Sequence, residues 1–126
     1  MKRTTLTLIA SFLALSGPVS ASQVDATIPA IDTALAGGGP VLVEVAAPWC
    51  VECQVEKPII EGLLTKPDFQ AMSRVVVDFD SQRDVLRHLQ VQSESTLIVY
   101  KGGKEVDRMI GVTDPAVIEA LLREVL

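Results

Sequence analysis

The stretch VEVAAPWCVEC, Val43–Cys53, decides the fold of this chain because it joins a strand, a turn and a helix. Residues 41–46 read VLVEVA, a short apolar and β-branched run that is typical of a strand buried on both faces. Pro-Trp follows as a turn, and a helix is expected over residues 50–66. The apolar side of that helix is predicted to carry Val51, Val55, Ile59 and Leu63.

Outward from this stretch, apolar periodicity and turn residues predict the other elements. Three further helices are expected: residues 28–36, a helix from Asp80 or Ser81 to about Gln90, and a last helix that begins at Asp114-Pro115. The expected strands are residues 75–79, 96–101 and 105–110. Strands separated by helices pair in parallel, whereas the Gly102-Gly103 turn joins an antiparallel hairpin. We therefore expect an α/β domain with a mixed, roughly four-stranded sheet and helices on both faces.

The N-terminus has the pattern of an export signal. Lys2 and Arg3 precede an apolar run, Leu6–Leu15, and small residues end at Ala21. We expect cleavage after Ala21, so that residues 1–21 are a signal peptide and residues 22–126 are one mature domain. In a Gram-negative host the location would be the periplasm.

The mature chain is acidic. Without Lys2 and Arg3, nine basic and sixteen acidic residues remain, which gives a net charge of −7. Nucleic acids and anionic membranes both favour clusters of Lys and Arg, so neither is an expected partner. A monomer is expected.

The chain has two cysteines, Cys50 and Cys53, and their spacing puts both sulfurs on one face of the expected helix. Cys50 lies at the first turn, where unpaired N–H groups and the helix dipole stabilise a thiolate, and Cys53 lies one turn deeper. An exposed, activated sulfur beside a sheltered one is what dithiol exchange requires. A structural staple closing so short a loop would stabilise little. A metal clip would need further ligands, and His88 is the only histidine.

Several motifs together resemble the thioredoxin family over essentially the whole mature chain: APWCVEC, Pro58 eight residues after Cys50, and the closing hairpin and helix. Within that family, W-C-V-x-C with DFQAMSRVVVDFD and VLRHLQVQ resembles the C-terminal periplasmic domain of the bacterial thiol–disulfide interchange protein DsbD. The resemblance implies a thioredoxin fold and a thiol–disulfide oxidoreductase, with Cys50 as nucleophile and Cys53 as resolving cysteine. It implies no cofactor.

The resemblance also implies roles for two neighbours of the pair. Trp49 would shape the surface on which partner proteins dock, the alternative being a core tryptophan. Glu44 falls where thioredoxins keep a buried acid, which would take the proton of Cys53; the alternative is a solvated glutamate at a sheet edge. Residues 75–77 offer no lysine where many thioredoxins have one, so Glu44 is expected to lack a basic neighbour and to have a raised pKa.

One family feature is missing. Thioredoxins carry a cis-proline opposite the cysteine pair, and the matching segment QSESTLIVY has Ser95 in its place. A cis bond before a non-proline residue costs about 3–4 kcal/mol, so we predict a trans Glu94–Ser95 peptide and an altered loop. The family backbone here pairs with substrate peptides. The candidate substrate-binding residues are therefore Trp49, Glu94, Ser95 and Thr96. Two consequences are open: the Ser95 hydroxyl hydrogen-bonds the Cys50 thiolate, or loss of the proline opens the dithiol to metal.

The charges near the pair bear on the direction of electron flow. Glu52 and Glu56 oppose negative charge on Cys50, which favours a reducing pair. The expected function is reduction of disulfides in other exported proteins. A membrane-embedded thiol transporter is the implied electron donor, because nothing else outside the cytoplasm regenerates the dithiol. The alternative is a copper or other metal-delivery module that uses Cys50 and Cys53.

Overall fold

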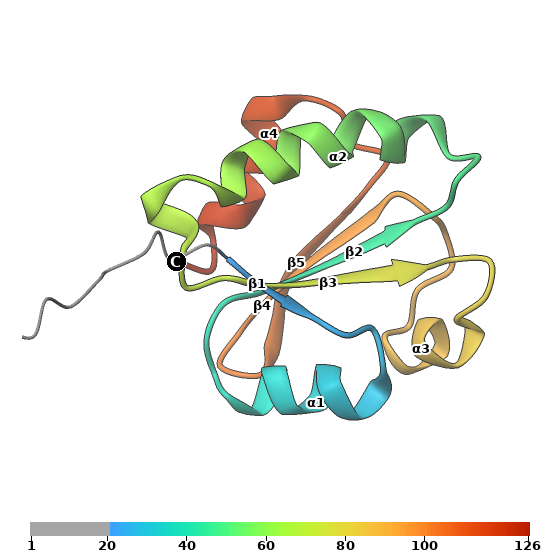
Figure 1. Ribbon diagram of the computed structural model, residues 1–126, viewed down its shortest axis with the longest axis horizontal. Coiled ribbons are helices and arrows are strands. Elements are labelled where there is room, and N and C mark those ends of the chain that lie inside the picture. The colour runs from blue at the N-terminus through green and yellow to red at the C-terminus, as the bar shows by residue number, and fades with distance from the viewer. Residues whose placement is uncertain (1–20) are drawn as a thin grey trace, which may run out of the picture.

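The central sheet has five strands in the order β1-β3-β2-β4-β5 (Figure 1). The computed structural model describes residues 21–126, so all but the last residue of the predicted signal peptide lies outside the described residues. The strands are β1 (Ser22–Val24), β2 (Val41–Ala46), β3 (Ser73–Asp78), β4 (Thr96–Lys101) and β5 (Lys104–Ile110). β1, β2 and β3 are mutually parallel where they pair, and β4 is antiparallel to β2 and β5. The mixed sheet is confirmed, but the predicted count of four strands is wrong because the short β1 has no clear apolar alternation.

Helices cover both faces of this sheet (Figure 1). The helical elements are α1 (Ile28–Ala36), α2 (Val51–Leu64), the 3₁₀ turn η1 (Pro67–Phe69), α3 (Arg83–His88) and α4 (Pro115–Arg123). α1 and α3 pack on one face, and α2 and α4 on the other. α3 starts later than expected because the polar groups that precede it form hydrogen bonds within the turn. Ser81 Oγ donates to Asp78 Oδ2 at 2.6 Å, and the Asp80 amide donates to Asp78 Oδ1 at 3.1 Å.

β2 is the central strand and is buried on both faces, as its composition predicts. Val41, Val43 and Val45 belong to the core under α1 and α3, whereas Leu42 belongs to the core under α2 and α4. Because side chains alternate along a strand, Glu44 points to the same face as Leu42. A charged residue is thereby placed beneath the helix that carries the two cysteines.

α2 buries a stripe that matches the predicted one only in part: Leu63 is buried as expected, whereas Val51 and Val55 are exposed. Val51 is 69% exposed and Val55 is 43% exposed. The buried residues of α2 are Cys53, Glu56, Ile60, Leu63 and Leu64. The helix is therefore rotated relative to the expectation, and its two valines lie at the surface beside the cysteine pair.

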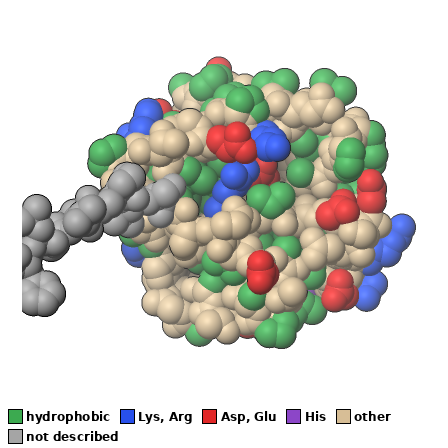
Figure 2. All heavy atoms as spheres, viewed as in Figure 1, with side chains coloured by type: hydrophobic (Ala, Val, Ile, Leu, Met, Phe, Trp, Pro, Cys, Tyr) green, Lys and Arg blue, Asp and Glu red, His purple; other side chains and the backbone are tan. Residues whose placement is uncertain are grey.

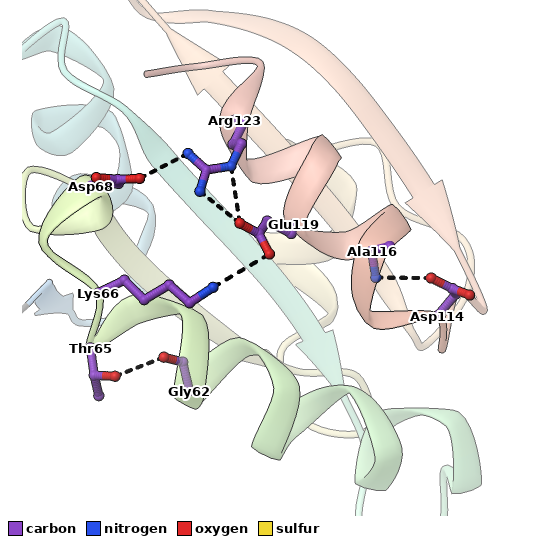
Figure 3. Close-up of polar contacts among 8 residues, drawn as sticks. All are labelled: Gly62, Thr65, Lys66, Asp68, Asp114, Ala116, Glu119 and Arg123. Atoms are coloured by element: carbon purple, nitrogen blue, oxygen red, sulfur yellow. Dashed lines mark hydrogen bonds and ion pairs between the residues drawn. The ribbon is translucent and has the colours of Figure 1, made fainter.

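The C-terminal helix is tied to the end of α2 by a small ionic network (Figure 3). Arg123 Nη1 lies 3.0 Å from Asp68 Oδ2, and its Nη2 lies 2.6 Å from Glu119 Oε1. Lys66 Nζ reaches Glu119 Oε2 at 3.5 Å. The Arg123 guanidinium also stacks over the ring of Phe69, 5.1 Å from its centroid. These groups are partly solvated, so apolar packing beneath them dominates the attachment of α4.

Candidate functional site

The two cysteines form a disulfide at the start of α2. Cys50 is the N-cap of the helix, and its Sγ accepts the amide hydrogen of Cys53 at 3.1 Å. This is the helix-terminus position that stabilises a thiolate once the disulfide is reduced. Cys53 Sγ lies 3.8 Å from the carbonyl oxygen of Val45, at the end of β2. The strand and the helix thus place both sulfurs at the C-terminal end of the central strand.

Cys53 is sheltered, as the sequence predicts, but Cys50 is sheltered as well. Cys50 is 2% exposed and Cys53 is 5% exposed, and they cluster with Ala47. The expectation of an exposed Cys50 is wrong for this oxidised form, because the turn and the partly buried Phe79 pack against the pair. A partner disulfide must therefore approach Cys50 closely along the surface around it.

Trp49 provides such a surface. Its side chain is 57% exposed, so it is not a core tryptophan. The indole Nε1 donates to both carboxylate oxygens of Asp80, at 3.1 and 3.0 Å. Its ring meets the edge of Phe79, with centroids 6.3 Å apart and an interplanar angle of 78°. The tryptophan is held in place while a large apolar area stays in contact with solvent. With Val51 and Val55 it forms an exposed apolar rim beside the dithiol.

Glu44 is buried, as the resemblance implies, with only 2% of its surface exposed. The expectation that it lacks a basic neighbour is wrong. Arg74 on β3 donates to Glu44 Oε2 from Nη2 at 2.6 Å and from Nε at 3.0 Å. The cation is not a lysine within residues 75–77 but an arginine one position earlier. In the parallel register Arg74 lies opposite Leu42, so its side chain shares the face of Glu44.

A pocket of about 500 Å³ opens between this ion pair and the resolving cysteine. Its lining includes Glu44, Arg74, Pro48, Cys53 and Lys57. Figure 2 shows acidic and basic side chains gathered in a hollow beside apolar ones on this face of the molecule. The pocket gives solvent a route to the buried side of the dithiol.

Glu56 is a site residue whose burial the sequence analysis did not predict. It was expected only to oppose negative charge on Cys50, and it is 0% exposed. The Ser95 hydroxyl donates to its Oε1 at 2.5 Å, and its Oε2 has no hydrogen-bond partner among the described protein atoms. Burial, opposed by the Ser95 hydrogen bond and reinforced by Glu44 and Glu52, raises the pKa of Glu56 to about 7. The spacing from Cys53 through Glu56 to Ile60 is a helical stripe that could have revealed this burial.

The loop opposite the dithiol has the predicted trans geometry. No cis peptide bond occurs within residues 21–126. Ser95 instead adopts a left-handed conformation with φ of 55°. Its amide donates to Val45 O at 2.9 Å and its carbonyl accepts from the Gly111 amide at 2.9 Å. The first bond holds the loop against β2 and the second joins it to the residue after β5. The Ser95 hydroxyl is bonded to Glu56 and not to Cys50.

The remaining substrate-binding candidates differ in exposure. Thr96 is 1% exposed, and its hydroxyl donates to the carbonyl of Ser93 at 2.7 Å. Ser95 is also buried, whereas Glu94 is partly exposed. Of these three loop residues, only Glu94 therefore presents side-chain surface to solvent. The assignment of this segment to substrate binding stays a prediction.

The described part of the chain offers little to a metal ion besides the cysteines. No group of three or more His, Cys, Asp or Glu side chains within residues 21–126 is placed to hold one. His88 Nε2 lies 2.7 Å from Asp32 Oδ1, which links α3 to α1. Within the same residues, no helix has the length and apolar character that crossing a bilayer requires.

Comparison with known proteins identifies the family of this fold and site. A family model described as Thioredoxin matches residues 22–124. The chain belongs to the thioredoxin family. Thioredoxin-2 of Saccharomyces cerevisiae is 38% identical over 95 residues, which are 75% of this chain and 89% of that protein. The thioredoxin of Mycobacterium tuberculosis (strain ATCC 25618 / H37Rv) is 34% identical over 108 residues, covering 82% of this chain and 90% of that protein.

A solved structure with 36% identity agrees with this assignment. The crystal structure of Trxlp from Edwardsiella tarda EIB202 matches with a TM-score of 0.77 and 36% identity, covering 80% of this chain and 98% of that one. This thioredoxin-family chain is therefore a thiol–disulfide oxidoreductase whose redox pair is Cys50 and Cys53. The thioredoxin fold predicted from the sequence is confirmed.

Proposed function

We propose that this thioredoxin-family protein is exported and reduces disulfide bonds in other exported proteins. The observation that carries the direction of electron flow is the pair of acids on α2. Glu52 is exposed in the first turn beside Cys50, and Glu56 is buried one turn on. Ionised carboxylates there oppose negative charge on the dithiol. A less stable thiolate means a less stable reduced form, and such a pair passes its electrons on readily.

Export is supported by the N-terminal pattern of Lys2, Arg3 and the apolar run that follows. The first strand of the fold begins at Ser22, so cleavage after Ala21 would leave every described element intact. A periplasmic location fits the similarity of W-C-V-x-C to the C-terminal domain of DsbD. Regeneration would then require electrons from a membrane-embedded thiol transporter, since the dithiol is consumed once per substrate disulfide.

The exposed rim around the disulfide supports disulfide-bonded proteins as substrates. Trp49, Val51 and Val55 present apolar area next to Cys50, and aromatic side chains of this kind anchor protein interfaces. The reaction begins when the Cys50 thiolate attacks a substrate disulfide and forms a mixed disulfide. Cys53 then attacks Cys50, which closes the internal disulfide and releases the reduced substrate.

The reduction potential of the Cys50–Cys53 pair tests this proposal. The protein is equilibrated in defined thiol buffers, and Trp49 fluorescence reports the redox state because its ring lies beside the pair. A potential near or below roughly −230 mV, close to that of thioredoxin, is the expected result. A value near about −120 mV, as in strong oxidants, would contradict the proposed direction. Determining the N-terminal residue of the protein recovered from the periplasmic fraction tests export, with Ser22 expected.

A further inference from the structure

The loop between α3 and β4, residues 89–95, is strained at both ends. Gln90 and Ser95 each have φ of 55°, and within residues 21–126 they are the only non-glycine residues with positive φ. This left-handed conformation is unfavourable for a residue that carries a Cβ, so neighbouring groups must hold it. Strained backbone of this kind is concentrated at functional sites. The α3–β4 loop is therefore a candidate part of the site.

The end of the loop at Ser95 is anchored next to the resolving cysteine. The Ser95 amide donates to Val45 O at 2.9 Å, and Cys53 Sγ lies 3.8 Å from the same oxygen. The Ser95 hydroxyl donates to Glu56 Oε1 at 2.5 Å. Glu56 Oε2 has no hydrogen-bond partner among the described protein atoms. The one hydrogen bond that the buried Glu56 side chain makes to a described residue is thus the bond that holds this loop.

The other end of the loop is held by Arg108 on β5. Arg108 Nη1 donates to Gln90 O at 2.9 Å, and its Nη2 donates to Leu89 O at 3.1 Å. Glu105, on the same strand, orients the guanidinium by accepting from Nε at 2.8 Å. The two carbonyls follow the last turn of α3, where carbonyl groups have no partner within the helix. One arginine binds both because its donors form a fixed planar fork.

Between these two anchors the backbone of Glu94 is free. Its amide and carbonyl make no hydrogen bond to another described residue, and the residue is partly exposed. Its neighbours are held: Ser93 O accepts from the Thr96 hydroxyl at 2.7 Å, and Ser95 O accepts from the Gly111 amide at 2.9 Å. A free amide and carbonyl in a fixed position can pair with an extended peptide in the manner of a β-strand.

We propose that Arg108 and Glu56 are positioning residues that clamp the two ends of the α3–β4 loop. Held in this way, the loop presents the Glu94 backbone to an extended substrate segment whose disulfide lies at Cys50. Neither side chain is hydrogen-bonded to Cys50 or Cys53, so each acts on docking and not on the exchange chemistry. The inference rests on the proposed function in one respect, that the substrates are proteins. It does not depend on the direction of electron flow.

Two matched substrates separate docking from chemistry. In the first, a coloured aromatic thiol is joined by a disulfide to the cysteine of an extended peptide of about ten residues. In the second, the same thiol is joined to a single cysteine with blocked ends. Attack of the Cys50 thiolate on the cysteine sulfur of either substrate forms a mixed disulfide and releases the same aromatic thiolate.

Stopped-flow measurements use the reduced mature protein, residues 22–126, which contains every described helix and strand. The dependence of the rate on peptide concentration gives a half-saturating concentration, which reports docking, and a limiting rate, which reports attack by Cys50. A residue that only caps α3 or fills the core would change stability and would affect both substrates alike. A residue that positions the loop should affect the peptide alone.

Arg108→Met and Ser95→Ala each release one end of the loop. Each should raise the half-saturating concentration of the peptide about tenfold, because a displaced docking group loses its contacts. The limiting rate and the rate with the single-cysteine substrate should change less than about threefold. The matched control is Arg123→Met, which removes surface ion pairs with Asp68 and Glu119 and should leave peptide docking unchanged.

Glu56 offers a conservative pair of variants. Glu56→Gln keeps an oxygen that can accept from the Ser95 hydroxyl, so peptide docking should stay within about threefold of that of the unmodified protein. Glu56→Met has a similar length but no acceptor, and it should raise the half-saturating concentration about tenfold, as Ser95→Ala does. Because methionine is apolar, its burial carries no unsatisfied polar group, and a docking defect in this variant is not a consequence of lost stability.

The double variant Arg108→Met with Ser95→Ala tests whether the two clamps act on one loop. Once one end is released, releasing the other should add little, so the double variant should bind the peptide about as weakly as the weaker single variant. Hydrogen exchange gives a second readout. Arg108→Met should speed exchange of the Ser95 amide about tenfold, although Arg108 makes no hydrogen bond to Ser95. Exchange of the Ile98 amide, in the middle of β4, should not change.

Peptide docking that is unchanged in both Arg108→Met and Ser95→Ala would overturn this inference and leave the proposed function intact. Losses that multiply in the double variant would also overturn it, because two independent sites would then be responsible. Equal slowing of both substrates would show that these residues only maintain the fold. An unmodified protein that reacts no better with the peptide than with the single cysteine would contradict proteins as substrates, and with them both the proposed function and this inference.

Discussion

Arg74 and Glu44 form a buried ion pair between two neighbouring strands, β3 and β2, directly beneath the helix that carries the dithiol. Arg74 Nη2 lies 2.6 Å from Glu44 Oε2, and the side chains are 14% and 2% exposed. Neither charge is well solvated, so the Glu44 carboxylate depends on Arg74 for compensation. Arg74 Nη1 also lies 3.9 Å from Oε1 of Glu61, whose side chain is 50% exposed. The pair fixes a carboxylate beside the pocket that leads to Cys53.

Replacing only one member of this pair should be strongly destabilising. Arg74→Met leaves the Glu44 carboxylate buried and unpaired, and the expected loss in free energy of unfolding is about 3–5 kcal/mol. Chemical denaturation of the oxidised protein measures this loss. The double variant Arg74→Met with Glu44→Leu should recover most of it, because an apolar pair avoids the desolvation cost of two charges.

The matched control for this prediction is Arg123→Met. Arg123 also makes ion pairs, to Asp68 and Glu119, but at the surface (Figure 3). Its removal should change stability much less than that of Arg74. Equal losses in the two variants would mean that burial of the Arg74–Glu44 pair has no energetic consequence.

Glu56 should make the stability of the protein fall with pH. Its pKa is raised from 4.5 to about 7 in the folded state, so the folded protein binds more protons than the unfolded chain between these values. Stability therefore falls as pH rises through this window, by about 3 kcal/mol in total. Glu56→Gln removes the effect. Relative to the unmodified protein, this variant should gain stability between pH 4.5 and about pH 8.

Denaturant titrations of the oxidised proteins at pH 4.5 and at about pH 8 measure the free energy of unfolding and check the Glu56 prediction. Glu61→Gln removes an acid whose side chain is 50% exposed, and it should leave the slope with pH nearly unchanged. If the free energies of unfolding of Glu56→Gln and the unmodified protein differ by the same amount at the two pH values, Glu56 does not titrate in this range.

Ser95 should carry a backbone cost that glycine relieves. Its φ of 55° lies in the left-handed region, which costs a non-glycine residue about 1–2 kcal/mol. Ser95→Ala and Ser95→Gly both lose the hydroxyl that binds Glu56, so their difference isolates the backbone. We expect Ser95→Gly to be more stable than Ser95→Ala by about 1 kcal/mol in denaturant titration. Equal or reversed stability would mean that the loop relaxes when the hydroxyl is removed.

The elements that sequence analysis predicted well are those with strong local signals. β2 is a continuous apolar run, α4 opens with an Asp N-cap followed by proline, and the β4–β5 hairpin has its glycine pair. The Asp114 side chain accepts from the Ala116 and Val117 amides, as a capping residue should. The order of these elements was enough to predict a mixed α/β sheet with the cysteine pair at the start of a helix, and the resemblance carried by APWCVEC then implied the thioredoxin fold.

The parts that could not be predicted depend on contacts between distant segments. β1 exists as a strand because it pairs with β3, more than 45 residues later in the chain. The Glu44 cation comes from another strand, and only the parallel register brings Arg74 to the right face. The burial of Glu56 was not predicted, because an acid on a helix usually faces water. Its burial follows from the rotation of α2, which Cys53 and Ile60 fix by packing inward.

Trp49 should matter for protein substrates more than for the chemistry of the dithiol. Its ring is 57% exposed next to Cys50, and the Asp80 hydrogen bonds and the Phe79 ring hold it in position. Trp49→Ala should lower kcat/KM for reduction of a disulfide-bonded protein by about tenfold, the loss typical of an anchoring aromatic residue. The rate with a small aromatic disulfide should change little, since that substrate buries almost no protein surface. Trp49→Phe keeps an aromatic ring without the indole N–H, so its kcat/KM for the protein substrate should lie between those of the unmodified protein and Trp49→Ala. Equal losses with both substrates would show that Trp49 acts on the cysteines themselves and not on docking.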